Sequence, residues 1–311
     1  MRTIRVGTRK SKLALVQSQL VIGWLEAQSD RFSCSLCRIV TKGDRIHDVA
    51  LAKVGGKGLF VKEIERALLD GTIDVAVHSM KDMPAELPPG LMIGAVPVRG
   101  DPHDVLLSGE KYTWATLPRG ASVGTSSLRR AAQMRHLRPD LKIRPLRGNV
   151  DTRIARMKAG DFDAIVLAAA GLKRLNIKEP AEALPFQLML PAVGQGALAI
   201  ECRSSDSELR TLLQSIHHEE TAVTVGAERA FLKRLNGSCR VPIAAYCERE
   251  PSGRLTLRGL VAAVNGKKVL ETRRLGRDPE TLGALAAEDV LARGAGDILA
   301  ELTLGSDSDA K

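Results

Sequence analysis

The most constraining feature of the sequence is a pattern that occurs twice in the same order. Val6-Gly7-Thr8 precedes a stretch with helical spacing, and residues 71–77 then form a Gly-Asp turn that leads into an apolar run. Val123-Gly124-Thr125 and residues 160–166 repeat both parts. Short apolar runs after turn residues are typical of strands buried on both faces. The repeat therefore predicts two similar α/β lobes that face each other across a cleft.

A third part of the chain follows the second lobe. Residues 190–201 are predicted to return the chain to the first lobe, and the alternation in residues 255–261 predicts a small antiparallel sheet with a terminal helix. At 311 residues the chain is long enough for each unit to bury its own core. We expect an α/β protein with lobe 1 over residues 1–98 and 197–216, lobe 2 over 99–196, and an α+β C-terminal domain over 217–311.

Polar side chains gather where the apolar run of residues 75–77 ends. His78, Lys81 and Asp82 follow the run, and Pro84 prevents a regular helix directly after them. Ligands of open α/β sheets bind at the carboxyl ends of strands, so Lys81 and Asp82 are candidates for chemistry. A solvated turn with a surface ion pair explains the same residues equally well.

The net charge of +10 indicates an anionic partner. Nucleic acid is disfavoured, because Phe, Trp and Tyr make up only 3% of the chain, too few for stacking platforms, and the basic residues recur at turns without forming a stripe. This distribution suits a pocket for a small polyanion. The start of the chain shows no signal-peptide pattern, and no apolar run reaches about 20 residues, so we expect a cytosolic protein with reduced thiols.

Two basic loops precede predicted helices in the first lobe. Residues 7–12 combine a glycine with three basic residues, and a glycine turn that opens a helix offers free backbone amides to an anion. Residues 53–60 contain three glycines together with Lys53 and Lys57. That composition fits either a mobile lid or a plain flexible connector.

The arginines of the second lobe form a separate group of candidates. Arg129, Arg130 and Arg147 lie at predicted strand-to-helix turns, where a planar donor with two prongs suits a carboxylate or a phosphate. Some of the other arginines in this lobe must be surface charges that contribute little.

The five cysteines fall into two groups. Cys34 and Cys37 lie three apart in a predicted strand and face opposite sides, so we interpret them as structural thiols. Cys239 lies in a glycine-flanked loop beside Arg240, an electropositive setting that favours a nucleophilic thiolate. A buried structural cysteine explains this position at least as well. The adjacent histidines at 217–218 diverge at a helix start, and we expect no metal site.

Several long blocks of the sequence resemble the porphobilinogen deaminase family, also called hydroxymethylbilane synthases. They occur in the family's order and extend over nearly the whole chain. The blocks are residues 7–11, 52–60, 76–82, 123–130, 146–149, 190–196 and 237–242. The resemblance implies a transferase of tetrapyrrole biosynthesis, with two lobes like type II periplasmic binding proteins and an active site in the cleft between them.

The resemblance also implies a cofactor and a reaction. Family members hold a dipyrromethane cofactor by a thioether, and the matching position here is Cys239. Four porphobilinogens are added head to tail with loss of ammonia, and hydrolysis then releases hydroxymethylbilane. Ammonia loss leaves an electrophilic azafulvene, and a fixed carboxylate, here Asp82, stabilises the cationic pyrrole that follows and shuttles protons. Each pyrrole carries an acetate and a propionate, for which arginine is the suitable donor.

Further residues are carried over from the family by position. Arg9, Arg147 and Arg153 match substrate-binding positions, and Lys53 and Lys57 lie on the loop that acts as a lid. The cofactor-binding positions match Ser11, Lys81, Asp82, Thr125, Ser127, Arg129, Arg130 and Arg174. The cofactor loop reads Gly237-Ser238-Cys239-Arg240 where the family often has Gly-Gly-Cys-Gln, a difference that bears on loop conformation.

Two other classes of function compete with this interpretation. A non-catalytic, two-lobed binding protein for an anionic solute explains the repeated lobes, and a nucleic-acid binder explains the charge. Asp82 and Cys239 argue against both, because a passive anion receptor gains nothing from a carboxylate in its cleft or from a specific loop thiol. We expect a monomer that binds porphobilinogen and has no nucleic-acid, membrane or metal partner.

Overall fold

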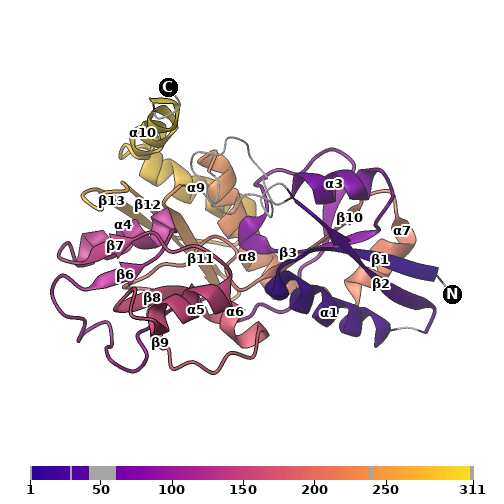
Figure 1. Ribbon diagram of the computed structural model, residues 1–311. Helices are drawn as coiled ribbons and strands as arrows, with labels where there is room; N and C mark the ends of the chain where they lie inside the picture. Colours follow the sequence, from indigo (N-terminus) through magenta and orange to yellow (C-terminus); the bar gives the residue numbers. More distant parts are fainter. Residues whose placement is uncertain (1, 29, 42–60, 238–240, 309–311) are drawn as a thin grey trace.

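The computed structural model describes residues 2–28, 30–41, 61–237 and 241–308, with side chains described as far as residue 301. Three sheets organise the chain: two of five strands and one of three. Figure 1 shows residues 2–98 of the first unit in indigo and purple, with its later segment, which includes α7, in a salmon-orange colour beside them; the second unit is mainly magenta, and the third is orange and yellow. Within the described ranges, no helix is long and apolar enough to cross a membrane. Lys53, Lys57 and Cys239 lie outside the described residues.

Lobe 1 is built on a mixed sheet with the strand order β2-β1-β3-β10-β4. Strand β1 runs parallel to β2 and β3, whereas β10 is antiparallel to both β3 and β4. The strands are β1 (Arg2–Arg9), β2 (Phe32–Ile39), β3 (Val75–Ser79), β4 (Leu91–Ala95) and β10 (Leu198–Arg203), and the helices are α1 (Lys12–Glu26), α3 (Lys62–Leu69) and α7 (Ser207–Gln214).

Lobe 2 repeats this topology with the order β7-β6-β8-β5-β9. Here β6 is parallel to β7 and β8, and β5 is antiparallel to β8 and β9. The strands are β5 (Asp104–Leu107), β6 (Ser122–Gly124), β7 (Lys142–Arg144), β8 (Ala164–Ala168) and β9 (Glu182–Leu184), and the helices are α4 (Leu128–Leu137), α5 (Val150–Lys158) and α6 (Ala169–Arg174). The two similar lobes predicted from the sequence repeat are confirmed.

The repeated glycines have a different role from the one expected. Gly7 lies inside β1, and Gly124 ends β6, so neither is the turn before the following helix. A Cβ at Gly7 would lie 2.3 Å from Cδ1 of Ile73, and a Cβ at Gly124 would lie 2.9 Å from Cδ2 of Leu146. Both glycines therefore pack closely against neighbouring side chains, which would have to shift to accommodate a larger residue. The expectation of a glycine turn before α1 was wrong: Ser11 caps this helix, and its side chain accepts a hydrogen bond from the Ala14 amide.

Two chain segments cross between the lobes side by side. The Gly100 amide donates to the Gly196 carbonyl at 3.1 Å, and a Cβ at Gly196 would lie 2.4 Å from the Gly100 oxygen. Gly196 also has a φ of 89°, which favours glycine. Glu228 joins the third unit to both crossing segments, because it accepts hydrogen bonds from the Arg99 guanidinium and from the Gly194 amide.

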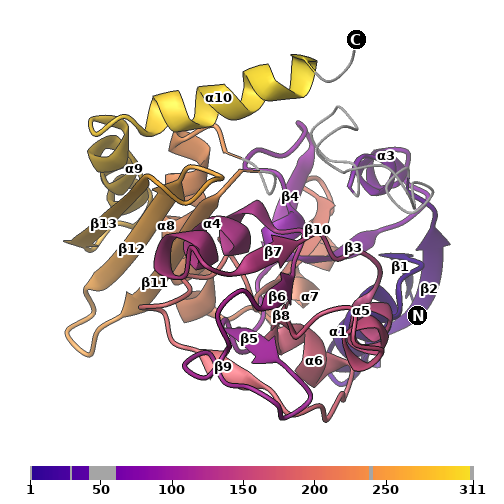
Figure 2. The same ribbon diagram turned by 60° about the vertical axis from the view of Figure 1, so that its left-hand side comes forward.

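The third unit places helices against a three-stranded antiparallel sheet, as predicted. Phe231 is completely buried in its core, and burial of such a side chain contributes about 1.5–3 kcal/mol. A Cβ at Gly283 would lie 2.3 Å from the Ala227 oxygen, so α8 and α9 approach closely. Figure 2 shows α10 along the top of the molecule. The elements are β11 (Ile243–Arg249), β12 (Leu255–Ala262), β13 (Val269–Gly276), α8 (Glu219–Arg234), α9 (Pro279–Leu291) and α10 (Ala295–Ser308).

Candidate active site

The end of β3 presents an acid and a base to the junction between the lobes. The strand stops at Ser79, and a 3-10 turn, Met80–Asp82, follows it. The Met80 amide donates to the Ala197 carbonyl at 3.0 Å, and a Cβ at Gly194 would lie 2.4 Å from Cγ of Met80. The crossing segment therefore fixes this turn. Asp82 is exposed, and none of the described residues bonds to its carboxylate.

A small cavity of about 60 Å³ lies at this end of the lobe 1 sheet. Gln17 on α1 donates from Nε2 to Oγ of Ser79 at 3.0 Å, which ties the helix to the end of β3. The polar residues that line the cavity are Arg9, Ser11, Gln17, His78, Ser79 and Asp82. The structure thus brings together Arg9, Ser11 and Asp82, three of the residues named from the sequence.

Lys81 extends toward lobe 2 and joins its cationic residues. Its Nζ donates to Oε1 of Gln195 at 3.4 Å. Burial, followed by the positive charge of Arg130, lowers the pKa of Lys81 to about 8, although Asp82 and Asp104 act in the opposite direction. The ammonium group is therefore held in a site that lacks enough negative charge to compensate it.

Arg129 and Arg130, in the first turn of α4, are buried and share one carboxylate, Asp104. Nη1 of Arg129 lies 2.7 Å from Oδ2 of Asp104, and Nη2 of Arg130 lies 2.7 Å from Oδ1. Gln195 donates from Nε2 to the same Oδ1 at 3.0 Å. Burial alone would raise the pKa of Asp104, but the charges of Arg129 and Arg130 hold it well below the usual range.

Two further arginines of lobe 2 are largely enclosed. Arg153 on α5 donates from Nε to the Gly148 carbonyl at 2.8 Å, and burial together with the charges of Arg130 and Arg147 lowers its pKa to about 10. Arg174 at the end of α6 donates to the Gly196 carbonyl at 2.6 Å, and burial lowers its pKa as well.

The hydroxyl residues named from the sequence have local structural partners. Ser127 caps α4, because its side chain accepts from the Arg130 amide at 3.4 Å. Oγ1 of Thr125 in turn accepts from the Ser127 amide at 3.2 Å. These contacts shape the turn that carries Arg129 and Arg130, and they leave the hydroxyl protons of Thr125 and Ser127 available to an acceptor.

This donor set fits a ligand that carries several carboxylates. Lys81, Arg129, Arg130, Arg153 and Arg174 are at least partly buried at the junction, whereas Asp104 is the buried acid that pairs with Arg129 and Arg130. A buried cation is costly unless an anion compensates it. Burial is the main cause of the lowered pKa values of Lys81 and Arg153, and neighbouring arginines lower them further; a polycarboxylate such as a dipyrromethane would neutralise these cations.

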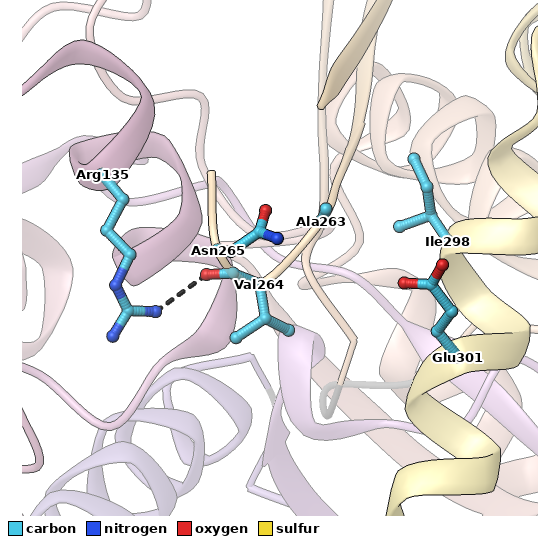
Figure 3. Close-up of a pocket in the computed structure, with 6 residues that line it drawn as sticks. All are labelled: Arg135, Ala263, Val264, Asn265, Ile298 and Glu301. Atoms are coloured by element: carbon cyan, nitrogen blue, oxygen red, sulfur yellow. Dashed lines mark hydrogen bonds between the residues drawn. The ribbon is translucent and has the colours of Figure 1, made fainter. Parts of the chain in front are cut away.

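A larger cavity of about 500 Å³ lies away from this junction, between the end of α4, the β12–β13 turn and α10 (Figure 3). Nη1 of Arg135 donates to the Val264 carbonyl at its edge, and Glu301 approaches from α10. Arg135 and Glu301 lie on opposite sides of this cavity, and Arg135 is the one cation among the described residues that line it, so the smaller cavity beside Asp82 is the better candidate for chemistry. In the described ranges, no three His, Cys, Asp or Glu residues are grouped to hold a metal ion.

The cysteines in the described part of the chain behave as structural thiols. Cys34 and Cys37 lie in β2 and are free, as are the buried Cys202 and Cys247. Burial raises the pKa of Cys34 and of Cys202 to about 11 in each case, and that of Cys247 to about 12. Burial therefore disfavours the thiolate form of Cys34, Cys202 and Cys247.

Sequence reasoning missed Asp104, Gln195 and Glu201. Asp104 begins the otherwise apolar run 104–107, and an isolated acid there was a usable signal for a buried ion pair. Glu201 is a similar acid inside β10, where its Oε2 lies 3.0 Å from Nε2 of His78. His78 is accordingly buried within β3, turned away from solvent.

Comparisons with known proteins agree with this geometry. Residues 4–211 match the family described as "Porphobilinogen deaminase, dipyromethane cofactor binding domain", and residues 222–292 match "Porphobilinogen deaminase, C-terminal domain". The porphobilinogen deaminase of Brevibacillus brevis is 54% identical over 299 residues, which cover 96% of this chain and 97% of that protein. The porphobilinogen deaminase of Moorella thermoacetica is 54% identical over 305 residues, 97% of each chain.

Among solved structures, the aliphatic sulphonate binding protein SsuA of Escherichia coli superposes with a TM-score of 0.41 at 16% identity, covering 74% of this chain and 70% of that one. Such a score adds nothing to the topology described above. The matches at the sequence level cover both lobes and the third unit. The chain therefore belongs to the porphobilinogen deaminase family, transferases that build hydroxymethylbilane and contain a dipyrromethane-binding domain.

Proposed function

We propose that the junction between the lobes is the site at which this porphobilinogen deaminase condenses its substrate. The observation that carries the proposal is the convergence of buried cations from lobe 2 beside the exposed carboxylate of Asp82 from lobe 1. When bound, the dipyrromethane supplies the pyrrole carbon to which each incoming porphobilinogen is joined. We assign its covalent attachment to Cys239, which lies outside the described residues.

The cations are proposed to hold carboxylates. Lys81, Arg129, Arg130 and Arg174, with the hydroxyls of Ser11, Thr125 and Ser127, bind those of the cofactor, whereas Arg9, Arg147 and Arg153 bind those of incoming substrate. Arg129 and Arg130 keep their bonds to Asp104 in this role, since each guanidinium has five N–H donors. We also propose that Lys53 and Lys57 belong to a lid over the substrate.

Asp82 is proposed to perform the acid–base step. Its carboxylate stabilises the positive charge that develops on a pyrrole nitrogen, and it accepts and returns protons as ammonia leaves and the new bond forms. A fixed position serves both tasks, and the Met80–Asp82 turn is held by the Ala197 carbonyl and by the close approach of Gly194.

The remaining features of the protein fit the same proposal. We propose lobe boundaries at residues 98, 196 and 216, and a monomer as the working unit. The free thiols of the described cysteines support a reducing, cytosolic location.

The intact mass of the purified protein, with peptide mapping, tests this assignment. We expect an excess equal to two porphobilinogens less two ammonias, located on the peptide that contains Cys239. Cys239→Ser should lack the excess, whereas Cys34→Ser, which alters a thiol of strand β2, should retain it. A bare chain that gains no mass on incubation with porphobilinogen, or an adduct on another cysteine, would contradict the assignment.

A further inference from the structure

Arg229 on α8 contacts the segment that carries Asp82, both before and after Asp82 in the sequence. Its Nη2 donates to the Pro84 carbonyl at 2.9 Å and to the Ala85 carbonyl at 3.1 Å. Its Nη1 lies 3.9 Å from Sδ of Met80, on the other side of Asp82 in the sequence. One planar guanidinium thus spans the Met80–Ala85 segment, which a single-point donor such as lysine cannot do.

A buried carboxylate lies near this guanidinium. Glu201 is fully buried, and its Oε1 has no hydrogen-bond partner among the described residues, while its Oε2 contacts His78. Burial lowers the pKa of Arg229, and the negative charge of Glu201 counteracts that effect. The negative charge of Glu201, in lobe 1, therefore helps to keep the buried Arg229 side chain charged.

We propose that Arg229 is a positioning residue, which fixes the Asp82 carboxylate relative to the helix that precedes the cofactor cysteine. Helix α8 ends at Arg234, and Cys239 follows five residues later in the sequence. The hydrogen bonds of Arg229 therefore connect that helix directly to the segment that carries Asp82. This inference rests on the role proposed for Asp82, and it assigns Arg229 no contact with substrate.

The test compares Arg229→Gln with wild type as holoenzymes whose adduct has been verified by intact mass. We expect kcat for porphobilinogen consumption to fall roughly 10- to 100-fold, because a displacement of about 1 Å at a catalytic group costs up to about 100-fold. KM should stay within roughly threefold, since Arg229 does not bind substrate. Arg234→Gln is the matched control on the same helix; Arg234 pairs with Glu288 at the surface, and its loss should leave kcat unchanged.

A double-mutant cycle with Asp82→Asn separates this inference from the proposed function. If Arg229 acts through Asp82, Arg229→Gln should have little further effect on the residual rate of Asp82→Asn. The inference would be overturned if the Arg229→Gln holoenzyme had the wild-type kcat, or if only its KM changed. A low rate of Asp82→Asn would still uphold the role of Asp82 in that case. An active Asp82→Asn would overturn that role itself. Should Arg229→Gln not fold, Arg229→Lys takes its place, and an unchanged kcat there would likewise overturn the inference.

Discussion

The two lobes have the same strand topology but place their buried acid differently. In lobe 2, Asp104 lies opposite Ala168, the last residue of β8, and therefore at the junction. The equivalent place in lobe 1, opposite the last residue of β3, is occupied by Leu198. Glu201, the fully buried acid of β10, lies three residues further along that strand.

This displacement gives each lobe its own chemistry. At the junction, Asp104 anchors the two arginines of α4, so lobe 2 presents a cationic wall suited to carboxylates. Lobe 1 has no acid in β10 at that level, and its exposed carboxylate, Asp82, comes from the turn after β3. The two lobes thus share a strand topology, although a fully buried acid lies at different levels of the equivalent strands β5 and β10.

The largest expected effect is the loss of turnover when the lobe 1 carboxylate is removed. Asp82→Ala should lower the rate of porphobilinogen consumption by roughly 10³-fold, within the range that acid–base groups supply. Its unfolding midpoint should stay near that of wild type, because the Asp82 side chain is exposed. Asp161→Ala, at an exposed acid of lobe 2, is the control and should retain activity. An active Asp82→Ala would contradict the assignment of the acid–base step to Asp82.

The two buried acids provide the second contrast. Asp104→Asn leaves two buried guanidinium groups uncompensated and should lower the free energy of unfolding by about 3–5 kcal/mol. Glu201→Gln affects one contact, to His78, and should cost about 1–3 kcal/mol. Urea unfolding of both variants measures the difference. Equal losses would show that the position of the acid does not matter.

The third expected effect concerns elongation. Arg147→Ala removes a cation of lobe 2 and should slow chain growth by about tenfold, the equivalent of about 1.4 kcal/mol. Enzyme–substrate intermediates should accumulate, and native gels or native mass spectrometry would detect them. Normal turnover without such intermediates would remove Arg147 from the substrate site.

A smaller effect follows from the pKa of Lys81, which burial lowers to about 8. Above that pH the side chain loses its charge, so uptake of the cofactor by apo-enzyme should weaken several-fold as pH rises through about 8. In Lys81→Met this step of the pH profile should be missing. The free energy of unfolding should change in the opposite direction. Between about pH 8 and 10.5 Lys81 is protonated in the unfolded state and largely neutral in the folded state, so the stability of the wild-type apo-enzyme should rise with pH relative to that of Lys81→Met. An identical uptake profile in both proteins would show that Lys81 does not titrate at this site.

Much of the fold was predictable from local patterns in the sequence. The apolar run at 75–77 and its echo at 164–166 identified equivalent strands, and the position of Lys81 and Asp82 after such a strand indicated a site. The histidines at 217–218 were expected at a helix start, and α8 begins at Glu219, where His218 caps it by accepting from the Thr221 amide.

Other parts depend on contacts between distant residues. The partnership of Arg129 and Arg130 with Asp104 joins α4 to a neighbouring strand, and sequence spacing carries no signal of it. The need for glycine at position 7 arises from Ile73 packing against β1. The link from Arg229 to the Pro84 carbonyl joins residues 145 positions apart. Such contacts follow from the order of strands in the sheets, which local patterns do not specify.

The affinity of Asp82→Asn for porphobilinogen is the most direct test of whether proton transfer by Asp82 is separate from substrate binding. Calorimetry would be performed on the fraction whose intact mass includes the cofactor, beside Arg147→Ala prepared in the same way. We predict that Asp82→Asn binds porphobilinogen with a Kd within about threefold of the wild-type KM while turning over almost none, and that Arg147→Ala binds at least about tenfold more weakly. Loss of binding in Asp82→Asn together with its turnover would contradict the assignment of proton transfer to Asp82 of lobe 1 and of substrate carboxylate binding to Arg147 of lobe 2.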